Sequence, residues 1–139
     1  MSNFSRYVNT IDRHLRRRRR EYMEPVGLKG IHARMIMAIC SNPGCSQDQL
    51  AKSMWFDKST IARQVELLED MGFLTRKPSE KDKRVLCVFP TEKMLQFQPG
   101  LAAAIKASEA ELLEGFTEED KQRLIALLSQ VCAKTDRGE

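Results

Sequence analysis

Four side chains that follow Asp57 have the chemistry of a nucleic-acid contact. Two are hydroxyls that hydrogen-bond phosphates or bases, and two are long polar groups able to make paired hydrogen bonds with a base edge. They are Ser59, Thr60, Arg63 and Gln64. Ile61, Val65 and Leu68 alternate with them at helical spacing and form an apolar stripe on another face. The pattern predicts a helix that buries one face and offers the polar face to DNA.

A second group of basic side chains lies where the sequence predicts a β-hairpin. Two strand-like runs, residues 73–77 and 84–89, are separated by the polar segment 78–83. The basic members are Arg76, Lys77, Lys81, Lys83 and Arg84, against the acidic Glu80 and Asp82. A thin hairpin with this local excess of positive charge suits phosphates and a narrow minor groove.

The elements that must position these groups are mainly helices. Apolar residues at helical spacing predict helices over residues 4–23, 29–39 and 92–115. Ser46 and Gln49 match a capping box that starts a short helix, Asp57 starts the next, and Thr117 opens the last. Pro99-Gly100 is expected to kink or break the helix that contains it.

The order helix, helix, short helix, longer helix, hairpin, helix, helix predicts a mainly α fold with a helix-turn-helix and a β-hairpin wing. Four segments carry a more specific pattern. They are Asp57–Arg63, Leu68–Arg76, Asp82–Arg84 and Thr91–Lys93, preceded by Asn42–Gln47. In this order they resemble the MarR (multiple antibiotic resistance regulator) family, and the clear resemblance covers residues 28–94. Trp55 stands where glycine is common in that family.

The resemblance implies a single MarR-like domain over residues 1–139. Residues 28–91 would form the winged helix-turn-helix lobe, and residues 1–27 and 92–139 the helical dimerisation region. A homodimer would bind a pseudo-palindromic operator in double-stranded DNA, act as a repressor, and be released by a small-molecule or oxidative signal. The implied DNA-binding residues are Ser46, Gln47, Lys58, Ser59, Thr60, Arg63, Gln64, Arg76, Lys81, Lys83 and Arg84. The residue matching Asp82 positions the wing in such proteins.

A small-molecule effector, anionic or aromatic, is a second expected partner. The candidate ligand-binding residues are Tyr7, Arg18, Tyr22, His32 and Met35. The run Arg16–Arg20 spreads around every face of its predicted helix, and a solvated surface run is the favoured interpretation. Contact with DNA phosphates and capture of an anionic effector remain as alternatives, because the arginine fork suits phosphate and carboxylate.

Composition narrows the remaining function classes. The chain has 139 residues with a net charge of +4, and it contains no apolar run of the ~20 residues that span a bilayer. We therefore expect a cytoplasmic protein without a membrane partner. Four cysteines without a CxxC pair, beside only two histidines, predict free thiols and no metal site.

The alternatives to a DNA-binding regulator are an enzyme and a protein-binding module. No catalytic triad, metal cluster or phosphate-binding glycine loop is readable, so we expect neither an enzyme nor a cofactor. A winged helix that binds another protein without sequence-specific DNA contact is the second alternative. A neutral recognition face would favour that function, whereas Arg63 and the basic hairpin favour DNA. A redox role for Cys40, Cys45, Cys87 or Cys132 stays open.

Overall fold

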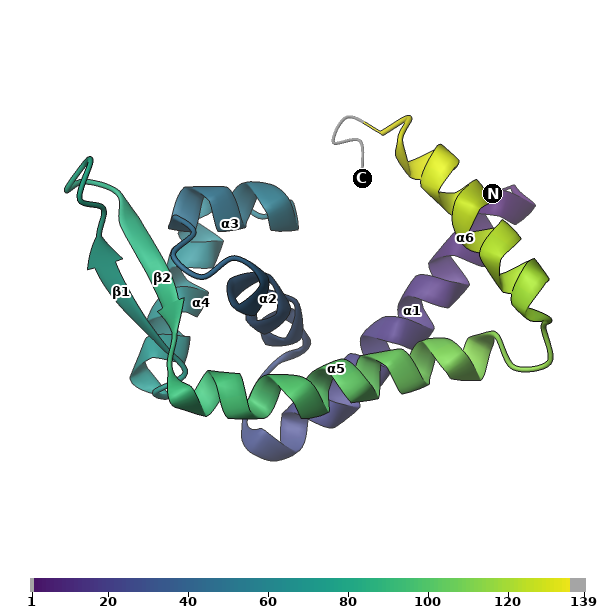
Figure 1. Cartoon of the computed structure of the whole chain (residues 1–139), viewed down its shortest axis with the longest axis horizontal. Coiled ribbons are helices and arrows are strands. Elements are labelled where there is room, and N and C mark those ends of the chain that lie inside the picture. Colours follow the sequence, from purple (N-terminus) through teal and green to yellow (C-terminus); the bar gives the residue numbers. More distant parts are fainter. Residues whose placement is uncertain (1, 136–139) are drawn as a thin grey trace. The chain divides into compact units, whose positions relative to one another are not determined.

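The computed structural model describes residues 2–135 and divides the chain into two compact units, residues 1–106 and 107–139. Figure 1 labels the elements along the chain. They are α1 (Asn3–Met23), the 3-10 helix η1 (Glu24–Val26), α2 (Gly30–Ser41), α3 (Gln47–Met54), α4 (Lys58–Asp70), β1 (Leu74–Pro78), β2 (Leu86–Pro90), α5 (Glu92–Leu112) and α6 (Glu118–Cys132). The predicted fold class, a mainly helical winged helix-turn-helix, is confirmed.

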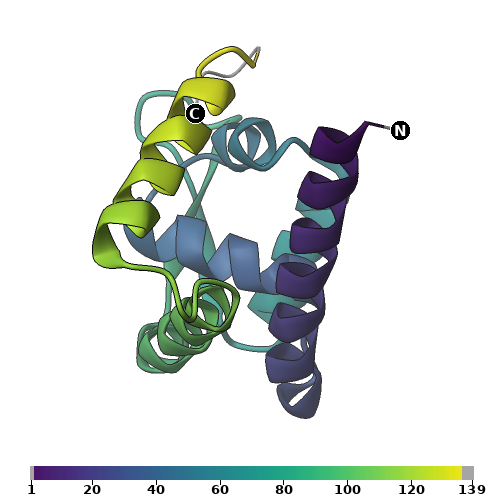
Figure 2. The ribbon, with the colours of Figure 1, turned by 90° about the vertical axis from the view of Figure 1, so that its right-hand side faces the viewer.

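Helix α2 forms the centre of the first unit. Both ribbon views place it between α3 on one side and the first part of α5 on the other (Figures 1 and 2). Met35, Ile36 and Ile39 of α2 are fully buried. They belong to one apolar cluster that also takes residues from α1, α3, α4, both strands and α5. Burial of this shared surface holds the elements of the first unit together.

The predicted helix starts are confirmed by their hydrogen bonds. The Ser46 hydroxyl accepts from the Gln49 backbone N–H at 3.0 Å, and the Gln49 side chain accepts from the Ser46 N–H at 2.9 Å. The Asp57 carboxylate accepts from the Thr60 N–H at 2.6 Å, and the Thr117 hydroxyl accepts from the Asp120 N–H at 3.1 Å. Each contact satisfies backbone donors that the first helical turn leaves free.

The turn between α3 and α4 contains a non-glycine residue with positive φ. Trp55 ends α3 with φ of 61°, in the left-handed region that glycine adopts without steric cost. The Trp55 N–H still bonds to the Ala51 and Lys52 carbonyls, so the turn keeps the form that a glycine would give it. The side chain is 56% exposed and is the only tryptophan of the chain.

The hairpin is antiparallel, but its strands begin later than predicted. The register pairs Leu74 with Pro90 and Pro78 with Leu86. Phe73 is not in the ladder, because its N–H bonds to the Leu68 carbonyl and closes the end of α4. Val85 is likewise outside it, because its N–H bonds to the Asp82 carbonyl within the tip. Both ends are thus set by turns that strand propensity does not reveal.

Of the expected kink or break at Pro99, the break is wrong, since α5 continues through this residue, and the kink stays a prediction. Tertiary packing holds this segment on α1. The rings of Phe97 and Tyr22 lie 5.8 Å apart, and Leu101 is fully buried. Gly100 allows the close approach, because a Cβ there would lie 2.6 Å from the Tyr22 hydroxyl oxygen. Contacts between the two helices therefore offset the missing N–H of the proline.

The second unit contains the last residues of α5 and helix α6. Its apolar stripe is exposed along α6 and consists of Leu124, Ile125, Leu127, Leu128 and Val131. Over residues 2–135, no helix combines the length and the apolar character needed to cross a membrane.

Candidate nucleic-acid interface

Helix α4 has two chemically distinct faces. Ile61, Val65 and Leu68 are fully buried in the core of the first unit. On the other side, Lys58, Ser59 and Arg63 are exposed and Thr60 is half-buried. Of the residues predicted to contact DNA on this helix, these four thus share one accessible surface.

The Asp57 carboxylate accepts hydrogen bonds at the start of α4. Hydrogen bonds from the Thr60 backbone and from the Ser59 hydroxyl, at 2.8 Å, lower the pKa of the Asp57 carboxyl to about 2. The carboxylate therefore stays charged at neutral pH and satisfies the free N–H groups of the first turn. Lys58 forms an ion pair with Asp48 of α3 at 3.3 Å. These contacts order the polar end of the helix, and they engage the proton of the Ser59 hydroxyl.

Gln64 lies apart from the exposed residues of α4. Its side chain is half-buried, and its carbonyl oxygen lies 2.7 Å from Nε2 of the fully buried His32. The predicted contacts Ser46 and Gln47 are also half-buried, at the start of α3. No hydrogen-bond partner of the buried Gln47 carbonyl oxygen is found within residues 2–135.

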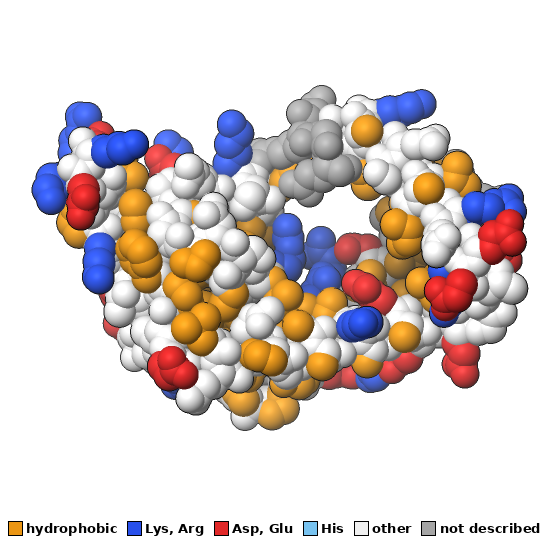
Figure 3. Space-filling view, in the orientation of Figure 1, with side chains coloured by type: hydrophobic (Ala, Val, Ile, Leu, Met, Phe, Trp, Pro, Cys, Tyr) orange, Lys and Arg blue, Asp and Glu red, His pale blue; other side chains and the backbone are white. Residues whose placement is uncertain are grey.

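The hairpin presents its basic side chains at the tip (Figure 3). Lys81, Lys83 and Arg84 are exposed, and 90% of the Arg84 side chain is accessible. Asp82 accepts from the Arg84 backbone N–H at 3.0 Å and from its guanidinium at 3.1 and 3.2 Å. These bonds lower the pKa of Asp82. Asp82 thus holds Arg84 in place while leaving most of the guanidinium open to a phosphate.

Arg76, predicted to bind DNA, has a partner inside the chain. Its guanidinium donates to Glu69 of α4 at 2.8 and 3.1 Å, and its backbone N–H donates to the same carboxylate at 3.1 Å. Hydrogen bonds from Arg76 lower the pKa of Glu69. The pair joins strand β1 to the end of α4, so Arg76 fixes the direction of the wing.

The structure does not bring the five predicted ligand-binding residues together. Arg18 and Tyr22 line a narrow crevice between α1 and α5. His32 and Met35 are fully buried in α2, and Tyr7 is 57% exposed on α1.

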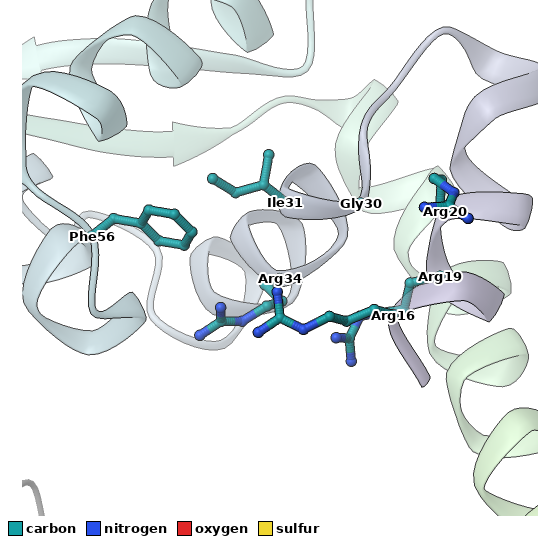
Figure 4. Close-up of a pocket in the computed structure, with 7 residues that line it drawn as sticks. All are labelled: Arg16, Arg19, Arg20, Gly30, Ile31, Arg34 and Phe56. Carbon is teal, nitrogen blue, oxygen red and sulfur yellow. The ribbon is translucent and has the colours of Figure 1, made fainter. Parts of the chain in front are cut away.

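A pocket of about 260 Å³ lies elsewhere in the first unit, between α1, α2 and the turn before α4 (Figure 4). Its lining residues are Arg16, Arg19, Arg20, Gly30, Ile31, Arg34 and Phe56. Sequence analysis identified the arginine run but missed Arg34 and Phe56, which are too far away in the chain to show as part of one motif.

Two of the four thiols are in surroundings that oppose oxidation chemistry. Burial raises the pKa of Cys40 and of Cys45, which disfavours the reactive thiolate at neutral pH. All four cysteines are free.

Comparison with known proteins gives consistent matches. A model of the MarR family matches residues 26–85, from η1 to the tip of the hairpin. YybA of Bacillus subtilis (strain 168), an uncharacterized HTH-type transcriptional regulator, is 36% identical over 102 residues, which are 73% of this chain and 68% of that protein.

Solved structures match over nearly the whole chain. A MarR protein from Peptoclostridium difficile has a TM-score of 0.87 at 26% identity, covering 94% of this chain and 85% of its own. A MarR family transcriptional regulator from Listeria monocytogenes, solved in complex with a 26mer DNA, has a TM-score of 0.86 at 28% identity. That match covers 94% of this chain and 87% of the Listeria chain.

The pair Glu69–Arg76 can be tested by its coupling energy. We expect Glu69→Gln and Arg76→Met each to lower the free energy of unfolding, with a coupling of about 1 kcal/mol in the double mutant. Because the folded pKa of Glu69 is lowered, its contribution is present above the ordinary glutamate pKa and is lost as pH falls below it. Urea unfolding at pH 7 and pH 3 measures both effects. Additive mutants would show that the pair does not hold the wing.

Proposed function

Because the chain belongs to the MarR family of transcriptional regulators, we propose that it is a repressor that binds a pseudo-palindromic operator in double-stranded DNA as a homodimer. The observation that carries this proposal is the exposed face of α4 beside the basic hairpin tip. The Listeria relative of similar fold, solved with DNA, supports it.

In this proposal α4 enters the major groove, and its exposed Arg63 makes paired hydrogen bonds with a base edge. Thr60 donates its hydroxyl proton to a phosphate near the start of the helix, where the helix dipole also favours negative charge. Ser59 does the same when its hydroxyl turns from Asp57 to the phosphate. Arg84, positioned by Asp82, reaches the adjacent minor groove, with Lys81 and Lys83 on the flanking phosphates. Base contacts from α4 supply selectivity, and the cations of the wing supply affinity that depends on salt.

The alternative, a winged helix that binds only another protein, lacks support from the surface of α4. Such a protein needs an apolar patch where the partner packs. The exposed side of α4 instead carries Lys58, Ser59 and Arg63. Selective, salt-dependent binding to a duplex would separate the two functions.

The DNA-binding proposal predicts two different mutational effects. Arg63→Ala should weaken binding to the preferred duplex by about 1–3 kcal/mol and relax its selectivity. Arg84→Ala should weaken binding and also reduce the salt dependence, because fewer phosphate contacts release fewer counterions. Fluorescence anisotropy on a duplex selected from a random pool, repeated across salt concentrations, measures both.

Arg123→Ala is the matched control, since it removes an exposed arginine from α6 in the second unit. Circular dichroism checks that every variant is folded. Unchanged affinity in both the Arg63 and Arg84 variants would contradict the assignment. Weak and unselective binding by the unmodified protein would favour the protein-interaction alternative.

The homodimer is supported by apolar surface that the single chain leaves uncovered. In α1 these residues are Phe4, Tyr7, Val8 and Ile11, and in α6 they include Ile125 and Leu127. Apolar residues that cluster on one face of a helix are typical of an interface, since exposure to water is unfavourable. Tyr7, predicted to bind ligand, lies within this face of α1.

We expect a dimer at micromolar concentration in light scattering. Ile11→Asp combined with Ile125→Asp should give monomers, because each aspartate would place a charge in a desolvated interface. Thr10→Asp, an exposed neighbour on α1, is the control for one added charge outside the apolar residues. A monomeric unmodified protein would contradict the dimer.

The arginine-lined pocket is the proposed effector site, and its ligand is a small anion with an apolar part. Arg16, Arg19 and Arg34 gather in it, while Phe56 and Ile31 supply apolar surface (Figure 4). Arg16 is paired with Asp12 at 2.7 Å. Arg34 has no carboxylate partner within residues 2–135, so its charge is available to a carboxylate or phosphate.

Arg34 also connects the pocket to α4. Its guanidinium donates to the Met54 carbonyl at 3.3 Å and lies 5.9 Å from the centre of the Phe56 ring. Both contacts are with the turn that precedes Asp57. An anion that draws Arg34 away would loosen this turn and change the position of the DNA-reading helix, which is how binding would release DNA.

Benzoate titration tests this coupling through Trp55, next to Phe56. We expect a saturable fluorescence change, and in Arg34→Gln at least about tenfold weaker benzoate binding, which corresponds to loss of a charge-assisted hydrogen bond. Arg17→Gln is the control, because Arg17 belongs to the same run but does not line the pocket. Equal affinity in the Arg34 and Arg17 variants would refute the site.

A further inference from the structure

His32 links the start of α2 to the DNA-reading helix. Its ring is fully buried and both nitrogens have partners. Nδ1 lies 2.9 Å from the backbone nitrogen of Lys29, which donates its proton to the ring. Nε2 lies 2.7 Å from the side-chain carbonyl oxygen of Gln64 on α4. The ring therefore spans two elements that are 32 residues apart in the chain.

These two contacts determine where the proton of the imidazole lies. Because Nδ1 accepts from the Lys29 N–H, the neutral ring carries its hydrogen on Nε2. Nε2 then donates to Gln64, which fixes the carbonyl oxygen of the amide toward the core. The NH₂ group of Gln64 is left on the other side. His32 stands at the third position of α2, where a side chain reaches back to the N-cap N–H in a capping box.

We propose that His32 is a positioning residue for the recognition helix: by donating to Gln64 from a ring anchored at the start of α2, it fixes the rotation of α4 against the core. This inference rests on the proposed function, in which α4 reads the major groove. It also gives Gln64 a role distinct from the direct DNA contact predicted from sequence. Arg63, the neighbour of Gln64, then contacts a base from a helix whose rotation is fixed by His32 on its core side.

The charge state of the ring supports this role. Burial lowers the pKa of His32, the Gln64 hydrogen bond opposes that shift, and the charge of Lys29 adds to it. The helix packed against the ring presents the uncharged Gln64. A second proton on Nδ1 would point at the Lys29 N–H, so two donors would face each other. The native contacts are thus complete above the ordinary histidine pKa of 6.5 and are lost as pH falls through the lowered folded value.

Nuclear magnetic resonance tests the hydrogen bond directly, and it does not require DNA. The chain has two histidines, so His14→Gln leaves His32 as the only imidazole. We expect the Nε2–H tautomer, a titration midpoint below 6.5, and a slowly exchanging Nε2 proton that Gln64→Met makes exchange rapidly. An Nδ1–H tautomer, or an Nε2 proton that is unaffected by Gln64→Met, would overturn the proposal.

A double-mutant cycle on DNA affinity tests the positioning role. His32→Asn keeps an acceptor at the position of Nδ1 for the Lys29 N–H but ends before the position of Nε2, so it cannot donate to Gln64. Gln64→Met removes the acceptor at similar volume. Each change should weaken binding to the selected duplex by about fivefold, the magnitude of one net hydrogen bond. The double mutant should bind no more weakly than either single mutant. The affinity of the unmodified protein should fall below pH 6.5, and that of the two single mutants should not. Glu66→Gln, exposed on the same helix, is the control.

The outcomes separate this inference from the proposed function. If Gln64→Met weakens binding while His32→Asn does not, Gln64 contacts DNA directly and the positioning role is wrong. Additive effects in the double mutant would also overturn it. If the unmodified protein binds no duplex while Arg63→Ala is equally inert, the DNA-binding function fails, and the resonance measurement still decides the hydrogen bond. If His32→Asn does not fold, the pH profiles of Gln64→Met and the unmodified protein provide the comparison.

Discussion

The burial of one side of α4 is the interaction on which the other features of the candidate interface depend. Ile61, Val65 and Leu68 are fully buried, so rotation of the helix would expose apolar surface at a cost of about 25 cal/mol for each Å². That constraint directs the side of α4 that carries Arg63 outward, and the proposed His32–Gln64 hydrogen bond then fixes the exact rotation of the helix. The same burial turns the Gln64 side chain toward His32 in the core. It also places Glu69 within hydrogen-bonding distance of Arg76 on the first strand.

Carboxylates near the interface decide what each neighbouring cation can do. Glu69 accepts hydrogen bonds from the backbone N–H and the guanidinium of Arg76, so that arginine attaches the wing to α4 and is not available to DNA. Asp82 holds Arg84 with similar hydrogen bonds, yet 90% of the Arg84 side chain remains accessible. The same residue type in the same hairpin thus serves structure in one place and is free to bind in the other. Exposure, rather than charge alone, distinguishes the two.

Much of the local structure followed from the sequence. The starts at Ser46, Asp57 and Thr117 depend on contacts within three residues, and the structure contains each of them. Predictions failed where a distant contact intervened. At Pro99 the predicted break is wrong, because packing against Tyr22 keeps the helix continuous. The strands were predicted one or two residues early, because turn hydrogen bonds at Phe73 and in the wing tip are invisible to strand propensity.

The order of elements, their caps, the buried stripe of α4 and the motifs that resemble the family can all be read from local sequence patterns. These are properties of neighbours, since helical periodicity and capping act within one or two turns. Only the tertiary structure decided which polar groups are used inside the chain. It joined Gln64 to His32 across 32 residues, and it brought Arg34 and Phe56 to the arginine run of α1. The physical reason is that such contacts depend on how separate helices pack together, and the spacing of residues along one helix does not specify that packing.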